Sequence, residues 1–138
     1  MTLFLGNYRH AIDDKGRLVL PSRFRAPFEG AGYIAPYEMN VVAIWTVEDF
    51  ERDFQKRFER LHESVEYDER FRNTNAHTYQ IEIDKQGRFL LNPQLREMFG
   101  LNGEVVIAGN GDHIEVWTPE RYATHIEANV GIFGNTIA

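Results

Sequence analysis

The sequence predicts a mainly β fold with helices (α+β), in which two copies of one unit interlock as a pseudo-two-fold β-barrel with flanking helices. Three observations lead to this prediction: the chain repeats itself, each copy carries short apolar strands joined by glycine turns, and each copy closes with a capped helix. One such copy cannot bury both faces of its strands, whereas two copies together can make one core.

The repeat is visible in two registers. A shift of 71 residues gives seven identities across positions 8–25, against roughly one expected from residue frequencies. The identical pairs are Tyr8/Tyr79, Ile12/Ile83, Asp13/Asp84, Gly16/Gly87, Arg17/Arg88, Leu20/Leu91 and Arg25/Arg96. After a one-residue insertion the shift becomes 72, which aligns Ile44-Trp45-Thr46 with Val116-Trp117-Thr118 and Glu48 with Glu120.

Each copy begins with two strands joined by a turn. The first strands are predicted at 8–12 and 79–83, and each runs into Asp-x-x-Gly-Arg, whose glycine suits a tight connection. The second strands, 18–20 and 89–91, are unbroken apolar runs, which predicts burial on both faces. Two more strands close each copy, at 33–35 with 41–45 and at 105–108 with 114–117, the last pair joined by the hairpin signal Asn110-Gly111.

Helix starts are marked by capping residues. Asn92 before Pro93, with Gly100 near the end, predicts a short helix, whereas residues 22–25 have room for about one turn before Pro27. Thr46 and Thr118 each cap a helix that follows a tryptophan. The first of these helices carries an apolar stripe, which we expect to pack on its own barrel or on a neighbouring subunit: Phe50, Phe54, Phe58, Leu61 and Val65. The second is shorter and carries Tyr122, Ile126 and Val130.

These elements divide the chain into four parts. We expect repeat 1 at 5–48, a helix and linker at 49–75, repeat 2 at 76–120, and a C-terminal helix and tail at 121–138. Within these parts, the polar residues 66–75 are predicted to link the copies, and residues 131–138 to form a loose tail.

Composition excludes several classes of protein. With 138 residues and 43% hydrophobic residues, the chain is neither disordered nor fibrous. It has no cysteine, which excludes disulfide scaffolds, thiolate metal sites and cysteine nucleophiles. No basic segment precedes the first apolar residues and no apolar run is long enough to cross a bilayer, so we expect a cytoplasmic protein without membrane partners.

The charge is unevenly distributed. The net charge of −6 by itself argues against binding a polyanion. Residues 1–28, however, carry five cations against two acids, whereas residues 76–138 carry four cations against eight acids. A local basic face at the N-terminal end is therefore compatible with the acidic total.

Motifs of catalysis are missing. There is no dinucleotide-binding or phosphate-binding glycine loop and no nucleophile elbow. Glu59-x-x-His62 has metal-ligand spacing but is a single pair on a charged helix, and Asp13-Asp14 becomes Asp84-Lys85 in the second copy. We therefore expect no enzyme, no catalytic or metal-binding residue, no cofactor and no small-molecule substrate. A β-barrel hydrolase or metal enzyme would have to carry bound metal when purified.

The two Asp-x-x-Gly-Arg turns remain as candidate functional residues. In one interpretation, the aspartate and arginine only pair across a tight turn. In the other, Arg17 and Arg88 project beside Lys15 toward phosphates or guanine edges, and Asp13 and Asp84 orient them.

Residues 4–25 read FLGNYRHAIDDKGRLVLPSRFR, and a second Asp-x-x-x-Arg motif follows at 84–88. The N-terminal run resembles the opening of the bacterial MraZ proteins, and the second motif stands where that family has one. The resemblance covers essentially the whole chain. It implies a tandem pair of AbrB-like (SpoVT-AbrB) swapped-hairpin half-barrels.

The resemblance also implies a function. The family controls the cluster of cell-division and cell-wall genes to which it belongs, by binding short promoter repeats, and its members assemble into rings. This chain is then expected to be a nucleoid-associated DNA-binding regulator, a repressor, acting as a homo-oligomeric ring. Its expected DNA-binding residues are Arg17, Arg88, Lys15, Asp13, Asp84 and Arg9. Lys15 has no basic counterpart, because Gln86 stands at its position in the second copy.

A ring would reconcile the acidic charge with DNA binding. Several small basic faces that meet several repeats in register gain affinity through effective concentration, without any new contact. The alternative is an antitoxin-like or adaptor barrel that binds a protein partner and contacts DNA only secondarily.

Overall fold

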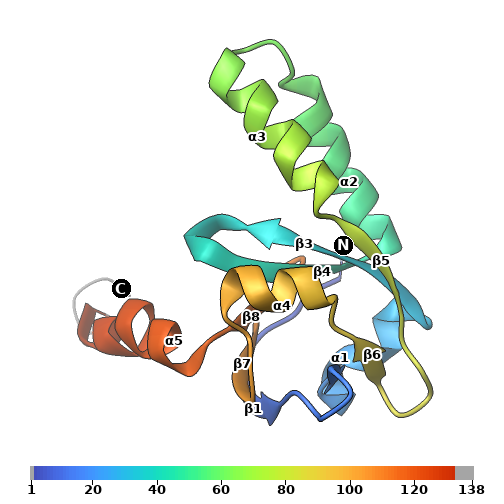
Figure 1. Cartoon of the computed structure of the whole chain (residues 1–138), viewed down its shortest axis with the longest axis vertical. Helices are drawn as coiled ribbons and strands as arrows, with labels where there is room; N and C mark the ends of the chain where they lie inside the picture. The colour runs from blue at the N-terminus through green and yellow to red at the C-terminus, as the bar shows by residue number, and fades with distance from the viewer. Residues whose placement is uncertain (1, 133–138) are drawn as a thin grey trace.

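The computed structural model describes residues 2–132, and its strands form one large sheet and one small ribbon (Figure 1). The antiparallel sheet has the order β1 (Asn7–Ala11), β7 (Glu104–Gly109), β8 (Ile114–Trp117), β4 (Val41–Thr46), β3 (Ala31–Tyr37) and β5 (Tyr79–Glu82). The ribbon pairs β2 (Arg17–Val19) with β6 (Arg88–Leu90).

The two copies are interlocked through these strands. β1 of the first copy pairs with β7 of the second, β5 of the second pairs with β3 of the first, and β2 pairs with β6. At the centre, β4 lies antiparallel to β8 with Ala43 opposite Glu115, so the pseudo-two-fold axis passes between these residues. The predicted α+β fold of two interlocked repeats is thereby confirmed.

The core lies between the inner face of the sheet and the ribbon. Leu18 and Phe89 face each other in register on the inward side of the ribbon, and both are buried. They pack with aliphatic residues of the sheet and with the short helices α1 (Ser22–Arg25), η1 (Ala26–Phe28) and α4 (Pro93–Phe99). Fully burying a side chain of this size contributes about 1.5–3 kcal/mol, so the ribbon is firmly fixed on the sheet.

The outward side of the ribbon corrects one prediction. Its strands were expected to be buried on both faces, but Leu90 is 58% exposed and Val19 is only partly buried. This side of the ribbon points away from the core, whose cluster includes Leu18 and Phe89 but neither Val19 nor Leu90.

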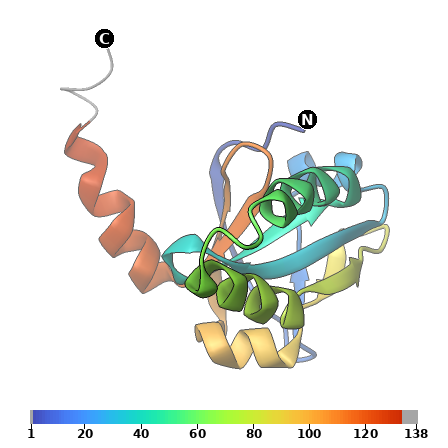
Figure 2. The same ribbon diagram turned by 90° about the horizontal axis from the view of Figure 1, so that it is seen from above.

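The predicted helix caps are confirmed. The side chain of Asn92 accepts a hydrogen bond from the backbone N–H of Gln94, and α4 ends at Gly100 with a left-handed φ of 64°. Thr46 caps α2 (Val47–Glu59), and Thr118 caps α5 (Pro119–His125). α5 continues into η3 (Glu127–Ile132), and together they project away from the sheet (Figure 2).

The predicted linker is a helix. Residues 66–75 lie within α3 (Val65–Ala76), which folds back along α2 as a helical hairpin (Figure 1). Ser64 caps this helix, and the ring of Phe71 packs 5.5 Å from that of Phe54 on α2. The predicted stripe is shorter than expected as well, because α2 ends at Glu59, before Leu61 and Val65. Of the predicted tail, residues 131–132 end η3, and 133–138 lie outside the described residues.

The outer face of the sheet is aromatic, with one buried polar cluster. Phe50 of α2 packs on Trp45, and Tyr122 of α5 packs on Trp117. Between them Glu115 accepts hydrogen bonds from Asn110, from Trp117 and from the Nε2 atom of His113 at 2.9 Å. No helix within residues 2–132 is both long and apolar enough to cross a bilayer.

The cluster shifts the acidity of its members. Burial by itself lowers the pKa of His113, but its hydrogen bonds to Glu115 and Asp112 outweigh this effect, and the net shift is upward. Burial raises the pKa of Glu115, and the hydrogen bond from His113 reverses that shift, so this pKa is lowered. The two groups therefore form an ion pair that is shielded from solvent, with His113 only 4% and Glu115 7% exposed.

This pair predicts a pH dependence of stability. A raised folded pKa means that protonated His113 stabilises the fold below its unfolded pKa of 6.5, and that this contribution is lost as the pH rises through the raised value. As the pH rises from about 6 through the raised pKa of His113, the free energy of unfolding in urea should fall in the wild type. His113→Gln keeps a donor for Glu115 without titrating, so it should remove this part of the decline. An equal decline in both proteins would contradict the assignment.

Candidate nucleic-acid interface

The two Asp-x-x-Gly-Arg turns have the same geometry. Oδ1 of Asp13 accepts hydrogen bonds from the backbone N–H groups of Lys15 at 2.9 Å and of Arg17 at 2.8 Å. Oδ1 of Asp84 does the same for Gln86 and Arg88, both at 2.9 Å. Each aspartate thus closes its own turn from within.

The aspartate also orients the arginine. Oδ2 of Asp13 accepts from Nε of Arg17 at 2.9 Å, and Oδ2 of Asp84 accepts from Nε of Arg88 at 2.8 Å. Only Nε is used, and within residues 2–132 the two terminal nitrogens of either guanidinium have no hydrogen-bond partner. The pairing across the turn and the outward projection of the arginine, which the sequence left as alternatives, therefore occur together.

The turn contacts hold both aspartates ionised. The backbone N–H of Arg17 is the largest cause that lowers the pKa of Asp13, and it outweighs the opposing effect of burial. The pKa of Asp84 is lowered in the same way, first by the backbone N–H of Arg88 and then by its side chain. Both pairs are about two-fifths exposed, so their value is in orientation rather than in stability.

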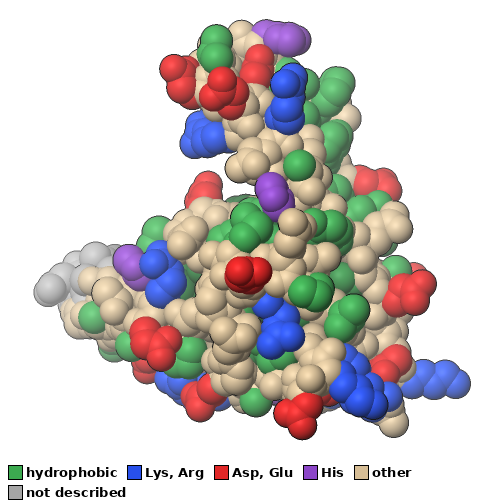
Figure 3. Space-filling model, viewed as in Figure 1, with side chains coloured by type: hydrophobic (Ala, Val, Ile, Leu, Met, Phe, Trp, Pro, Cys, Tyr) green, Lys and Arg blue, Asp and Glu red, His purple; other side chains and the backbone are tan. Residues whose placement is uncertain are grey.

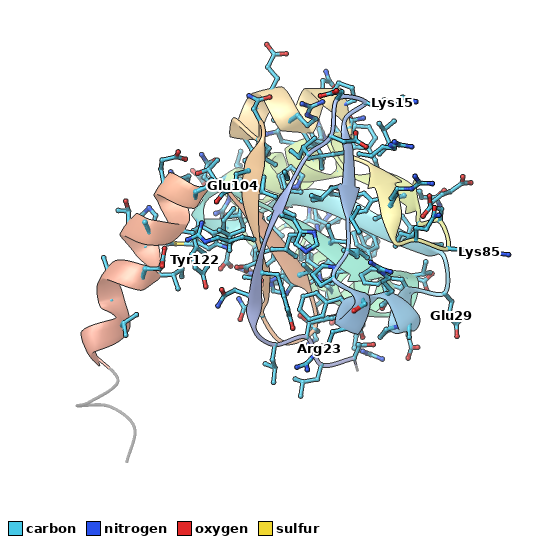
Figure 4. All side chains as sticks on the ribbon, turned by 90° about the horizontal axis from the view of Figure 1, so that it is seen from below. Lys15, Arg23, Glu29, Lys85, Glu104 and Tyr122 are labelled. Carbon is cyan, nitrogen blue, oxygen red and sulfur yellow. The ribbon has the colours of Figure 1, made fainter. Side chains whose placement is uncertain are left out.

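The ribbon brings the two arginines close together. Arg17 lies opposite Leu90, two residues from Arg88, and such a diagonal relation puts Cα atoms about 7–8 Å apart. Because Leu18 and Phe89 point inward, Arg17 and Arg88 both belong to the outward side of the ribbon. Lys15 and Lys85 project from the two turns at this end of the molecule, with Arg23 and Glu29 at its edge (Figure 4).

Each turn also receives an arginine from the other copy, which the sequence-based site did not include. A Cβ atom on Gly16 would lie 2.8 Å from Nη1 of Arg96, and one on Gly87 would overlap the side chain of Arg25. Arg25 is held by a 2.8 Å hydrogen bond from its Nε to the carbonyl of Leu20. Burial and the charge of Arg25 lower the pKa of His10, in keeping with a positive potential here. The sequence does contain a signal for these two contacts, because Arg25 and Arg96 are identical residues at the shift of 71.

Arg9 lies apart from this cluster. It belongs to β1, and its guanidinium pairs with Glu104 at 3.2 Å and with Glu127 at 3.4 Å. The other predicted site residues, Lys15 and the two Asp–Arg pairs, are brought together at the ribbon.

The described part of the chain contains few groups arranged for metal binding or catalysis. No three His, Asp or Glu side chains within residues 2–132 gather closely enough to hold a metal ion. The polar hollow of about 360 Å³ between α4 and α5 is lined by Gly100, Asn102, Glu104, Thr118, Pro119 and Glu120, a set with no nucleophile–base pair.

Comparison with known proteins covers both copies. The family model described as "MraZ protein, putative antitoxin-like" matches residues 3–70 and 75–130. The chain belongs to the MraZ family of transcriptional regulators.

Curated members of the MraZ family match along nearly their whole length. The "Transcriptional regulator MraZ" of Thermomicrobium roseum is 35% identical over 91% of this chain and 88% of that protein. Those of Mycoplasmoides gallisepticum and Roseiflexus castenholzii are 33% and 32% identical, over 95% and 99% of this chain and 92% and 97% of theirs. The MraZ family is a family of regulators and not an enzyme class, and its match includes both turns.

The contact of Arg96 with the turn of this MraZ-family chain can be tested at Gly16. Gly16→Ala should lose about 1–2 kcal/mol for a side chain in the left-handed region, and more because the new methyl group displaces Arg96. Gly103→Ala is a matched control, since Gly103 also has a positive φ, of 61°, but open space around its Cβ position. Urea denaturation should show a larger loss for Gly16→Ala, and equal losses would refute the contact.

Proposed function

We propose that this chain is a sequence-specific DNA-binding regulator that contacts promoter DNA through the outward side of the β2–β6 ribbon. The observation that carries the proposal is the pair of identical turns, each of which presents an oriented arginine with free terminal nitrogens. An arginine in that state can bind a phosphate, or O6 and N7 of a guanine together.

The dimensions of the ribbon suit the major groove of B-DNA. That groove is about 12 Å wide and admits a two-stranded β-ribbon. Two arginines about 7–8 Å apart on one ribbon can therefore enter the same groove. Exposed Leu90, beside Arg88, is an apolar group of the kind that contacts thymine methyl groups.

Cations from both copies surround the ribbon. Lys15, Arg17 and Arg96 meet at the first turn, and Lys85, Arg88 and Arg25 at the second. In this proposal Arg17 and Arg88 contact the DNA, Asp13 and Asp84 orient them, and Lys15 adds a phosphate contact. Arg9, tied to two acids on β7 and η3, contributes least.

The wider role follows from the family resemblance. We propose that the chain binds short promoter repeats at the nucleoid. In this way it represses the cluster of cell-division and cell-wall genes to which its own gene belongs. A homo-oligomeric ring would let several weak faces engage several repeats at once, so that effective concentration offsets the acidic net charge of −6. Binding should then rise steeply with repeat number and fall with salt.

Binding to promoter DNA from upstream of the protein's own gene cluster tests directly whether the two arginines contact DNA. In fluorescence anisotropy at two salt concentrations, Arg17→Ala and Arg88→Ala should each lose about 1–3 kcal/mol of binding free energy and reduce the salt dependence. Arg72→Ala is a matched control, because it removes the same charge from an exposed position on α3, outside the ribbon. It should bind as the wild type does.

The opposite outcome favours the adaptor. If the wild type does not bind, or if both arginine variants bind normally, the turns are structural and the antitoxin-like alternative in the family's description takes precedence. Capture of a protein partner would then survive Arg17→Ala.

An experiment can separate two effects of Asp13 on DNA binding: the repulsion of phosphates by its charge and the orientation of Arg17. Removing a negative charge next to DNA strengthens binding if the carboxylate only repels phosphates, and weakens it if the carboxylate positions Arg17. We expect Asp13→Asn to bind several-fold more weakly in the same assay. Asp14→Asn, the same change one residue away at an exposed position without a hydrogen bond in the described chain, should bind slightly more tightly. Tighter binding by both variants would contradict the orienting role.

A further inference from the structure

Two buried hydrogen-bond donors without a partner lie beside one groove. Within residues 2–132, three buried side-chain nitrogens have no hydrogen-bond partner, and two of them are Nε1 of Trp45 and Nη1 of Arg57. Trp45 is only 2% exposed. Both residues line a groove of about 640 Å³ between the α2–α3 hairpin and the end of β3, and Figure 3 shows the hollow between the hairpin and the rest of the molecule. Because buried donors are nearly always paired in proteins, this coincidence points to a ligand site.

The second copy shows which kind of group pairs with such a tryptophan. The shift of 72 aligns Trp45 with Trp117 and Ala43 with Glu115. Nε1 of Trp117 donates a hydrogen bond to Oε1 of Glu115 at 3.1 Å. In the first copy an alanine stands in place of that glutamate, and Ala35, which lies opposite Ala43 on β3, is also small and lines the groove. The acceptor for Trp45 can thus come from a bound molecule.

The charges around Trp45 require this acceptor to be uncharged. Glu115 faces Ala43 across β4 and β8, and its lowered pKa keeps it ionised. Burial raises the pKa of Tyr37 in the groove to about 12, and the negative charges of Glu38 and other nearby carboxylates add to this shift. A further carboxylate here would be repelled. A carbonyl oxygen or a ring nitrogen accepts the same hydrogen bond without that cost.

The side of the groove formed by the hairpin carries the opposite charge. Its lining includes Lys56, Arg60 and Arg70, which are all exposed. Arg60 pairs with Glu63 at 3.1 Å, whereas Lys56 and Arg70 have no ion pair within residues 2–132. An anionic group of a ligand is therefore favoured at this side of the groove.

We propose that the groove binds a mononucleotide. The rings of Tyr37, Tyr67 and Phe71 line it and offer surfaces on which a base can stack. A carbonyl oxygen or ring nitrogen of the base accepts from Nε1 of Trp45, and the phosphate lies beside Arg57 and the exposed cations of α2 and α3. The volume of about 640 Å³ suits one small molecule. The lining shares no residue with the β2–β6 ribbon, so the inference goes beyond the proposed DNA contact.

Calorimetric titration of the full chain tests the binding. The probes are AMP, GMP, CMP and UMP. The controls are the matching nucleoside, which lacks the phosphate, and ribose 5-phosphate, which lacks the base. At least one nucleotide should bind at one site per chain, about tenfold or more tightly than either control. The proposal is overturned if none of the four binds at millimolar concentration, or if a control binds equally well.

Matched variants locate the site. Arg70→Glu should weaken binding about tenfold or more, because it reverses a charge in the groove. Arg72→Glu, the same change on α3 outside the groove lining, should bind as the wild type does. Trp45→Phe removes the donor and should also weaken binding about tenfold, whereas Trp117→Phe should not. Circular dichroism checks each fold, and Arg70→Glu decides the test if Trp45→Phe does not fold. Equal binding by Arg70→Glu and Arg72→Glu would contradict the site.

Fluorescence separates the two tryptophans. In Trp117→Phe, Trp45 is the only tryptophan left, and its emission should change as the nucleotide binds. In Trp45→Phe, the emission of Trp117 should stay constant. The reverse pattern would put the ligand elsewhere and overturn the proposal. These measurements contain no DNA, so their outcome is independent of the proposed function.

Discussion

The pairing of β2 with β6 is the contact on which the rest of this structure depends. Each strand finds its partner only in the other copy, and Leu18 and Phe89 meet in register over the inner face of the sheet. β1 and β5 likewise pair with strands of the opposite copy. Neither copy therefore has a complete sheet or core alone, and the fold and the interface form as one cooperative unit.

The same pairing builds the candidate interface. Alternation along the ribbon sends Leu18 inward and Arg17 outward, and the antiparallel register sets the distance between Arg17 and Arg88. It also brings Arg96 under the first turn and Arg25 under the second. The outward side of the ribbon is thus shared by both halves of the chain, although each Asp–Arg motif is local in sequence.

Local signals made most of the fold predictable. Caps at Thr46, Asn92 and Thr118 and the repeat itself identify elements because their causes lie within a few residues. α3 was missed because its polar composition hides two aromatic residues that matter only against α2. The exposure of Leu90, the partners of Arg9 and the contact of Arg96 with Gly16 depend on distant segments, so no local pattern reveals them.

The residues that face each other across the pseudo-two-fold axis differ in chemistry, and this difference affects which halves of two chains can pair. Ala43 faces Glu115 across the axis, and Glu115 is satisfied by partners on its own strand and the hairpin before it. If the second halves of two chains exchanged strands with each other, two buried glutamates would stand face to face, a costly arrangement of like charges. The difference between Ala43 and Glu115 therefore discourages the C-terminal half from pairing with itself and favours closure within one chain.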